Sequence, residues 1–318
     1  MSLSLLATNE LLSGDENQRG HRRNNSIGRI EKIERGSNYS FFFQMRHFIF
    51  ILLILSQKNL LSQELIFDNG IYIEKPIFTD TSQHRYTLDN KIFAINKSFT
   101  YDSYFLDSFS VKRKFYKEGE GIRPKSPTGL AEYKSTSSDV IDKVRLIVTD
   151  DLNIFLRSDS SYSQTVVKYQ YLNSSGVSIG SEETGVIENS MNLWLHPPRG
   201  NNFRILEINP FPFLSLQDTT SQWSWSMNVW ESWSDSRWKD WIGTVELKYA
   251  YKRLGDESID TKFGKLNCKV SEGIGSSKIG TTYLKSYFNE KYGFVRLEYT
   301  NINGTKLIIW LVAVDEKI

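Results

Sequence analysis

The last third of the chain alternates apolar and polar residues between short turns, and this pattern limits the possible folds more than any other feature. Residues 244–252 read TVELKYAYK, so one face of the segment is apolar and the other polar, as in a half-buried strand. An Asn-Gly pair within residues 301–305 is a strong hairpin signal. Further strands are expected in a hairpin at 258–270 with its turn at Gly264, and at 280–287, 294–299 and 306–314. Sequential strands joined by short turns predict an antiparallel meander.

The chain upstream of this meander is also β in character. Residues 165–172 read TVVKYQYL, in which β-branched and aromatic residues dominate, as half-buried strands require. Residues 119–136 are rich in Gly, Pro, Ser and Thr, which predicts a long loop. No stretch has the spacing and caps of a long amphipathic helix. Further strands are expected at 67–78, 91–109, 111–116, 140–148 and 153–157. We therefore expect a mainly β fold, with residues 63–318 forming a single β domain.

Residues 45–62 have the layout of a secretory signal peptide. A basic start at Met45 precedes a short apolar run, and a polar stretch then leads to a cleavage position near Ser62 and Gln63. The run is shorter than the roughly 20 residues that span a bilayer. Residues 1–44 are polar without an apolar period, so we expect them to be disordered and to lie outside a natural product that starts at Met45. The alternative is a membrane-anchoring helix with a cytoplasmic tail.

One phrase of the meander resembles known proteins. The sequence YFNEKYGFVRLEY at 287–299, together with Cys268, the stretch 276–280 and the turn at 301–304, is similar to exported proteins of Bacteroidetes-type bacteria. It also resembles strand–turn–strand phrases of the half-open β-barrel class, to which the lipoprotein carrier LolA belongs. The resemblance is limited to residues 244–314. It implies a large curved antiparallel sheet, half-open, around an apolar cavity.

A segment rich in tryptophan and proline, residues 191–241, precedes the meander. It holds four of the seven prolines, and six of the eight tryptophans lie within 223–241. Trp223 and Trp225 would share one face of a strand, whereas the four tryptophans that follow would share a face of a short helix over residues 232–241. The segment predicts an irregular or short-helical cap on the sheet. Its rings either form a small core or, if exposed, contact a ligand.

The HPPR motif at residues 196–199 is the sharpest local signal. Its two prolines fix φ and remove backbone donors, so a stiff loop would present His196 and Arg199. Arg199 could clamp a carboxylate or phosphate; alternatively, His196 bonds a backbone carbonyl and Arg199 pairs with an acid. A buried Glu207 would need a partner, for which Arg199 or Arg204 is expected. The residues expected at the rim of the cavity are Trp194, His196, Arg199, Trp223, Trp225, Trp230 and Trp233.

Composition excludes several classes of function. Residues 1–62 carry a net charge of +3 and the rest −1, and a nearly neutral body without a basic block argues against nucleic acid as a partner. Cys268 is the single cysteine, which excludes an internal disulfide; we expect it to be buried on the same strand face as Leu266 and Val270. Signatures of phosphate loops, serine hydrolases and zinc proteases are missing. We expect no catalytic residue, no cofactor and no metal.

Three functions are compatible with this pattern. The first is an exported, periplasmic or extracellular, non-enzymatic protein whose half-barrel cavity binds an apolar ligand, such as an acyl chain or the lipid of a lipoprotein partner. The second is a carbohydrate- or cell-wall-binding module that uses exposed tryptophans. The third is a hydrolase with a carboxylate pair, since such pairs follow no spacing rule in sequence. The exposure of the tryptophans, and the cavity that they face, separates the first two.

Overall fold

The computed structural model describes residues 64–75, 90–119, 126, 128–149, 164–217 and 221–316. All of them belong to one compact unit, Ser62–Ile318. The signal peptide expected at 45–62, the segment 1–44 and the strand expected at 153–157 lie outside the described residues. Among those that are described, no helix has the length and apolar character needed to cross a membrane.

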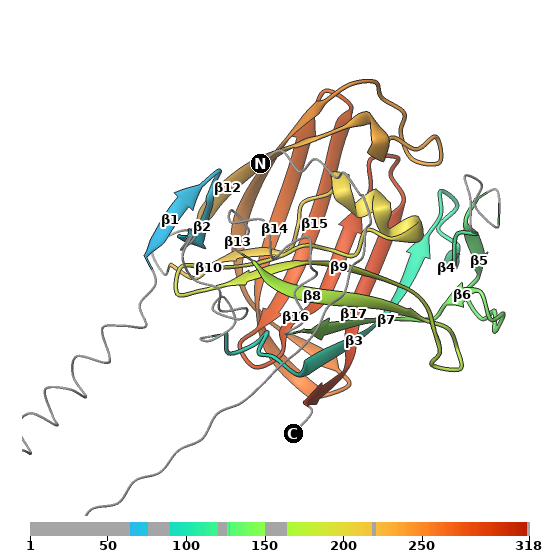
Figure 1. Ribbon diagram of the computed structural model, residues 1–318, viewed down its shortest axis with the longest axis horizontal. Helices are drawn as coiled ribbons and strands as arrows, with labels where there is room; N and C mark the ends of the chain where they lie inside the picture. Colours follow the sequence, from blue (N-terminus) through green and yellow to red (C-terminus); the bar gives the residue numbers. More distant parts are fainter. Residues whose placement is uncertain are drawn as a thin grey trace, which may run out of the picture. The chain divides into compact units, whose positions relative to one another are not determined.

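One large antiparallel sheet dominates the described part of the chain (Figure 1). Neighbouring strands follow the order β11-β10-β9-β8-β7-β3-β17-β16-β15-β14-β13-β12, a path that curls until it nearly closes into a barrel. The strands of this path are β3 (Lys97–Leu106), β7 (Lys143–Val148), β8 (Thr165–Leu172), β9 (Ser178–Glu188), β10 (Asn192–Leu195), β11 (Phe213–Ser215), β12 (Gln222–Val229), β13 (Val245–Thr261), β14 (Gly264–Ser277), β15 (Gly280–Asn289), β16 (Gly293–Thr300) and β17 (Lys306–Glu316). The predicted mainly β fold, a half-open barrel built on a large antiparallel sheet, is confirmed.

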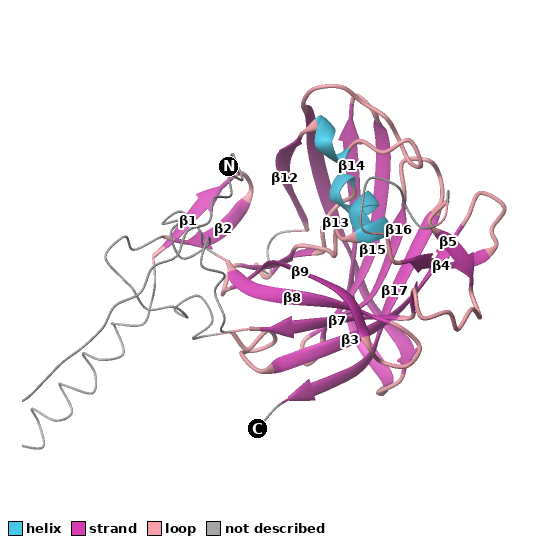
Figure 2. Ribbon diagram, turned by 45° about the vertical axis from the view of Figure 1, so that its right-hand side comes forward, coloured by secondary structure: helices cyan, strands magenta, loops and turns pink. Residues whose placement is uncertain are grey.

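The two halves of the sheet cross each other. In Figures 1 and 2, strands β13 to β15 run steeply, whereas β8 and β9 cross in front of them. The inward side chains of both halves meet in one buried cluster, which includes Tyr169 on β8, Leu284 on β15 and Leu297 on β16. Aromatic and branched side chains on facing halves thus form the main core.

The predicted meander is confirmed and is more continuous than expected. β13 joins the stretches expected at 244–252 and 258–261, with an irregularity in its pairing between Arg253 and Gly255. The turn at Gly264 and the hairpins that follow lie where the alternation predicted them. Cys268 faces the core with Val270, as predicted, while Leu266 is half-buried.

Three parts of the upstream sequence differ from expectation. The strand expected at 67–78 is instead a hairpin, with a turn at residues 69–70. β9 was not predicted, because the first eight of its eleven residues read SIGSEETG and lack the alternation that marks a strand. The long loop expected at 119–136 contains β5 (Leu130–Glu132), which pairs with β4 (Lys112–Tyr116); β4 also pairs with β6 (Val140–Ile141). β9 and β5 both form by antiparallel pairing with strands near them in the sequence, β8 and β10 for β9 and β4 for β5, although their own residues lack a strand pattern.

The tryptophan-rich segment combines short strands of the sheet with irregular and short-helical stretches, so its prediction as an irregular or short-helical cap holds only outside those strands. It contributes β10, β11 and β12, together with the 3-10 helices η3 (Asn201–Ile208) and η4 (Glu231–Trp233). The short helix expected over 232–241 is wrong. The Asp235 carboxylate accepts the Arg237 backbone N–H at 3.0 Å, and Asp235 bridges to Lys239 across a tight turn. A carboxylate that bonds the backbone two residues on favours a turn over a helix.

Side chains close the seam between the two ends of the sheet. β11 and β12 form its edges, and no ladder between them is present among the described residues. The Tyr251 hydroxyl donates to the Phe211 carbonyl at 2.9 Å and accepts the Trp225 indole N–H at 2.9 Å. The Arg253 guanidinium donates to the Ser215 carbonyl at 2.9 Å. The barrel is thus closed by hydrogen bonds from β13 rather than by strand pairing.

An N-terminal hairpin, β1 (Leu65–Asp68) and β2 (Ile71–Glu74), packs near this seam. Asn192 on β10 accepts the Tyr72 backbone N–H at 2.8 Å, and Asn189 donates to the Tyr72 carbonyl at 2.9 Å. Ile71 and Ile73 join a second buried cluster that contains Trp194 and Trp225. Gly70, with φ of 99°, lies so close to Ser224 and Trp225 that any side chain there would clash.

Candidate functional site

The HPPR motif forms a fixed corner between β10 and η3. The His196 backbone N–H donates to the Gly185 carbonyl at 3.1 Å, and the preceding Leu195 N–H donates to Pro212 at 2.9 Å. Pro197 is buried. The Arg199 backbone N–H is bound by the Glu182 carboxylate at 2.6 Å. The corner is therefore held from both sides, which gives it the stiffness that its two prolines predicted.

His196 and Glu207 form a buried pair below this corner. His196 Nε2 lies 3.6 Å from Glu207 Oε2, and Nδ1 lies 2.7 Å from the Pro197 carbonyl, to which it donates. The prediction that His196 bonds a backbone carbonyl is correct. The partner expected for Glu207 was an arginine, but the nearest ionisable side chain in the structure is His196, because η3 turns the carboxyl inward.

Burial controls the protonation of both groups. It lowers the pKa of His196 to about 3, with help from the nearby Arg199 charge. It raises the pKa of Glu207 to about 7, against the opposing charge of Arg199. Near neutral pH the imidazole is therefore uncharged and a large fraction of Glu207 is protonated, while the 3.6 Å between Nε2 and Oε2 is too long for a hydrogen bond.

Aromatic rings enclose the pair. The His196 ring lies 4.6 Å from Phe211 and 6.0 Å from Trp194. Trp194 in turn contacts Trp225, with ring centroids 5.7 Å apart. The Trp194 indole N–H and Glu207 Oε2 have no hydrogen-bond partner in the described part of the chain. The site is thus an apolar cage around a few polar atoms rather than an open catalytic cleft.

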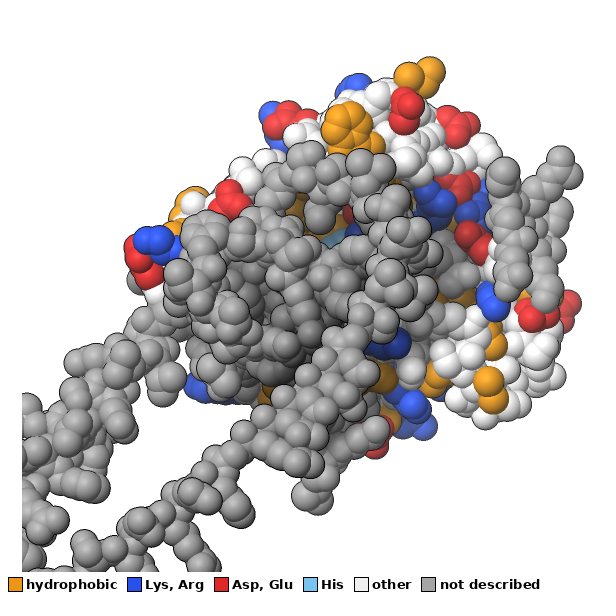
Figure 3. All heavy atoms as spheres, in the orientation of Figure 1, with side chains coloured by type: hydrophobic (Ala, Val, Ile, Leu, Met, Phe, Trp, Pro, Cys, Tyr) orange, Lys and Arg blue, Asp and Glu red, His pale blue; other side chains and the backbone are white. Residues whose placement is uncertain are grey.

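Two guanidinium groups lie at the outer side of this cage. Arg199 and Arg204 lie over the half-buried Trp233 ring, at 5.8 and 5.4 Å from its centroid. Arg204 also donates to the Ser232 carbonyl at 2.7 Å. Trp230, three residues before Trp233, is 59% exposed. Figure 3 shows hydrophobic side chains at the upper edge of the molecule, where Figure 1 places the connection between β12 and β13.

The seven residues expected at a cavity rim are placed at different depths. Trp194 and Trp225 are buried in the second core, and Trp223 stacks on Tyr251 at 5.7 Å. His196, Arg199 and Trp233 come together at the corner, whereas Trp230 lies outside it. Trp223 and Trp225 do lie on one strand, but the later tryptophans do not share a face: Trp238 packs against the main core.

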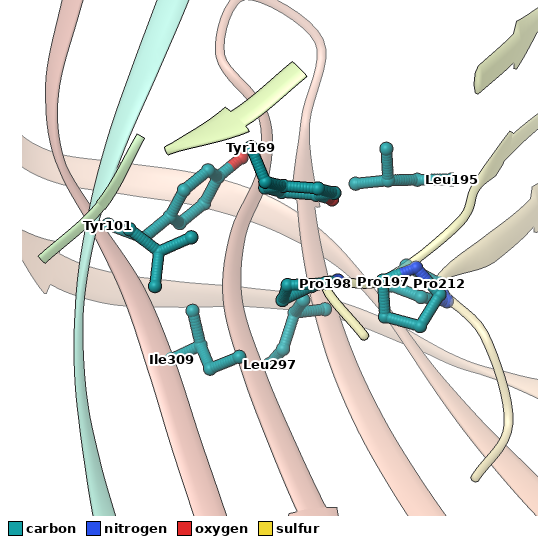
Figure 4. A pocket seen from close by; sticks show the side chains of 9 residues that line it. Tyr101, Tyr169, Leu195, Pro197, Pro198, Pro212, Leu297 and Ile309 are labelled. Carbon is teal, nitrogen blue, oxygen red and sulfur yellow. The ribbon is translucent and has the colours of Figure 1, made fainter. Parts of the chain in front are cut away.

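The cavity beside the corner is small. It measures about 20 Å³ and is lined by side chains of both sheet halves and three prolines (Figure 4). This is space for about one water molecule, whereas sites for drug-sized ligands measure roughly 300 Å³ or more. The ligand-sized apolar cavity that the half-barrel implied is not found here, because Tyr101, Tyr169 and Leu297 occupy the space.

A larger groove lies on the outward face of the sheet and was not predicted. It measures about 400 Å³. Two neighbouring cross-strand rows form its floor: one runs from Glu272 through Lys285, Glu298 and Ile308 to Tyr104, and the other from Tyr283 through Thr300 and Lys306 to Leu106. The alternation predicted that these positions face outward. Which outward residues become neighbours depends on strand order and register, which local pattern does not contain.

Cys268 is not placed as a nucleophile. Cys268 is buried, and burial followed by the nearby Glu257 and Asp256 raises the pKa of its thiol to about 11, far from the thiolate form that a nucleophile needs. Over the described ranges, no group of three or more His, Cys, Asp or Glu side chains is placed to hold a metal ion.

Comparisons with known proteins give similarities in fold alone. No family model and no curated protein matches the chain. A candidate lipoprotein from Parabacteroides distasonis has a TM-score of 0.42 and 11% identity, over 71% of this chain and 100% of its own. A candidate exported protein with a YmcC-like fold from Bacteroides fragilis has a TM-score of 0.34 and 10% identity, over 70% and 96%. The hypothetical lipoprotein YmcC from Escherichia coli has a TM-score of 0.29 and 11% identity, over 72% and 92%.

Proposed function

We propose that this chain is an exported, non-enzymatic binding protein that holds a saccharide chain in the groove on the outward face of the sheet. The observation that carries the proposal is the difference between two volumes: the outer groove measures about 400 Å³, whereas the interior cavity measures about 20 Å³. Of these two spaces, the one large enough for a ligand lies outside the barrel. The proposal favours the second of the three functions that the sequence suggested, at a different place.

The chemistry of the groove suits a sugar. Tyr283 is 42% exposed and offers a ring face, and Tyr104 lies at the other end of the floor. Between them stand long hydrogen-bonding side chains of both charges: Lys285, Glu298 and Lys306. Sugars present C–H groups that pack on aromatic faces and hydroxyls that bond to charged side chains. An acyl chain would cover these polar side chains without offering them hydrogen bonds, which is unfavourable.

The first function, an apolar ligand inside the barrel, is supported less well. A lipid in the interior would have to displace core side chains such as Tyr169 and Leu297. Exposed tryptophans as a sugar platform are also supported less well, because Trp194 and Trp225 are buried and only Trp230 is largely exposed. Large exposed apolar side chains, such as Phe109 at 85% and Ile242 at 88%, lie outside the groove, so a lipid contact at the surface would use other residues than those that line the groove.

Export and lack of catalysis rest on the sequence. The signal-peptide layout of residues 45–62 supports export to the periplasm or beyond. The missing enzyme signatures support a binding role. Within the groove, Glu272 and Glu298 lie in one row with Lys285 between them, so their strands are roughly 10 Å apart. Lys285 is also bound to Glu257 at 3.2 Å. This arrangement favours hydrogen bonding to a ligand over a hydrolytic pair.

A glycan array followed by calorimetry tests the proposal. We expect one class of oligosaccharide to bind, and Tyr283→Ala to weaken that binding about tenfold, because it removes the exposed ring face. Trp230→Ala, which removes an exposed ring outside the groove, should leave the affinity unchanged. Loss of binding in Trp230→Ala but not in Tyr283→Ala would move the site to the tryptophan loop. Release of reducing ends from the bound glycan would contradict the non-enzymatic part, and lipid co-purifying in native mass spectra with an empty array would contradict the whole.

A further inference from the structure

We infer that Arg199, Arg204 and Trp233 form a second binding site, which takes an oxyanion, a carboxylate or a phosphate, on a small soluble molecule. The two guanidinium groups come from different elements, the HPPR corner and η3, and both pack against one indole ring at 5.8 and 5.4 Å. Both also act electrostatically on the Glu207 carboxyl. Both guanidinium groups therefore lie beside the same indole ring, at the outer side of the aromatic cage.

Neither arginine is neutralised by an acid. Among the described residues, no carboxylate lies within ion-pair distance of Arg199 or Arg204. The only hydrogen bond from the Arg204 side chain to a described residue goes to the Ser232 carbonyl, and its Nε is buried without a partner there. The Arg199 guanidinium has no described hydrogen-bond partner at all. A guanidinium has five N–H donors in a fixed fork, so Arg199 keeps its donors for an oxyanion, and Arg204 keeps those of the Nη1 atom that neither burial nor Ser232 engages.

The acids nearby are engaged elsewhere. The Glu182 carboxylate accepts the Tyr171 hydroxyl and the Arg199 backbone N–H, both at 2.6 Å. Asp235 is held by Arg237, which donates to both of its oxygens. Glu207 faces His196, and burial favours its protonated form. Positive charge therefore remains at the corner near neutral pH, and it is anchored on a backbone that two prolines and a 3-10 helix make rigid.

The site is separate from the groove in its residues and its charge. Acidic and basic side chains together line the groove, whereas the HPPR corner presents two arginines and the indole ring of Trp233. Bidentate guanidinium bonds select carboxylate and phosphate by their geometry, and an indole beside them adds contact with a ring-shaped or apolar body. A sugar acid or a sugar phosphate combines both features.

Titration of the full-length protein with glucuronate, inorganic phosphate and glucose, followed by the indole N–H signal of Trp233 in NMR, tests this inference. We expect saturable shifts with glucuronate, phosphate or both, no shift with glucose, and weaker binding at higher salt. Arg199→Gln and Arg204→Gln should each lower the affinity roughly tenfold or more, since a charged hydrogen bond is lost. Lys239→Gln, an equal change of charge at an exposed position on the neighbouring loop, should have no effect.

The outcomes distinguish a carboxylate ligand from a phosphate ligand, and the arginine site from the groove proposal. A shift with glucuronate alone identifies a carboxylate ligand, and a shift with phosphate alone identifies a phosphate ligand. Equal shifts with glucose, or no saturable shift with either anion, would overturn the site. If an arginine variant does not fold, the unchanged protein still tests the site. Anion affinity that falls as salt is added supports it, and affinity that does not change with salt contradicts it. Tyr283→Ala should leave the Trp233 titration unaltered, so failure of the groove proposal would not be mistaken for failure of this one.

Discussion

At the scale of single residues, the buried pair of His196 and Glu207 is the least expected feature. The two groups lie 3.6 Å apart and are shielded from solvent by aromatic rings. Burial stabilises the neutral form of each, so their effects on stability have opposite dependence on pH. The lowered pKa of His196 makes the protein lose stability as the pH falls from 6.5 toward 3. The raised pKa of Glu207 makes it lose stability as the pH rises from 4.5 toward 7.

Glu207→Gln separates these two effects. Below pH 4.5 Glu207 is protonated in both the folded and the unfolded chain, and above that pH only the folded chain keeps the proton. Relative to the unchanged protein, the variant should therefore gain about 3 kcal/mol in free energy of unfolding between pH 4.5 and pH 7. Urea unfolding at several pH values measures this difference. Glu231→Gln, at an exposed acid nearby, is the control and should show no such trend. A difference that stays constant with pH would mean that Glu207 ionises normally.

The contribution of the sequence was uneven at this scale. It predicted that His196, Arg199 and Glu207 belong to one site. The two prolines of the HPPR motif indicated a stiff loop, and the single acid between Leu206 and Ile208 indicated a buried carboxylate that needs a partner. It assigned the wrong partner to Glu207, because partner choice depends on the direction in which η3 turns its side chains. For the tryptophans it left a small core and a ligand contact open, and the structure buries Trp194 and Trp225 in a core because the hairpin and β13 pack over them.

At the scale of elements, the N-terminal hairpin depends on two asparagine side chains. Asn192 is 2% exposed and bonds both the N–H and the carbonyl of Tyr72, at 2.8 and 3.2 Å. Its replacement by Ala would leave the Tyr72 N–H without its partner. We expect Asn192→Ala to cost about 1–3 kcal/mol and to speed hydrogen exchange at the Tyr72 amide more than at amides of β15 and β16. Asn228→Ala, exposed on β12, is the matched control. Unchanged exchange at Tyr72 would show that apolar contacts alone hold the hairpin.

The same scale explains which strands were predictable. β13 to β17 are ordered along the chain as they are in the sheet, so each strand finds its partner through a short turn and its alternation records which face is buried. β9 and β5 also pair in the sheet, but their residues do not alternate between apolar and polar, so their sequences do not indicate strands. β11 and β12 lie close in sequence but at opposite edges of the sheet path. The position of the seam is therefore a property of the whole sheet, and no local signal marks it.

At the scale of the whole molecule, the structure separates a filled interior from a grooved exterior. The inward faces of both halves carry large side chains, including Tyr101, Tyr169 and Leu297, which leave about 20 Å³ between them. The curvature of the sheet, which a resemblance to half-open barrels implied, is therefore compatible with a solid core. Whether a curved sheet encloses a ligand depends on the size of its inward side chains and not on its topology.

Leu297→Ala tests this separation. Removal of a buried side chain beside the existing cavity should cost about 2–5 kcal/mol in free energy of unfolding and should enlarge the space enough to admit a small apolar probe such as xenon. The unchanged protein should show no saturable binding of xenon at this site, by chemical shifts of the residues that line it. Glu272→Ala, on the outward face of the sheet, should change stability by less than about 0.5 kcal/mol and leave the interior closed. If the unchanged protein already binds the probe inside, the core opens readily. The apolar ligand that the sequence first suggested would then be favoured over the saccharide, because the barrel could admit an acyl chain by displacing its own side chains.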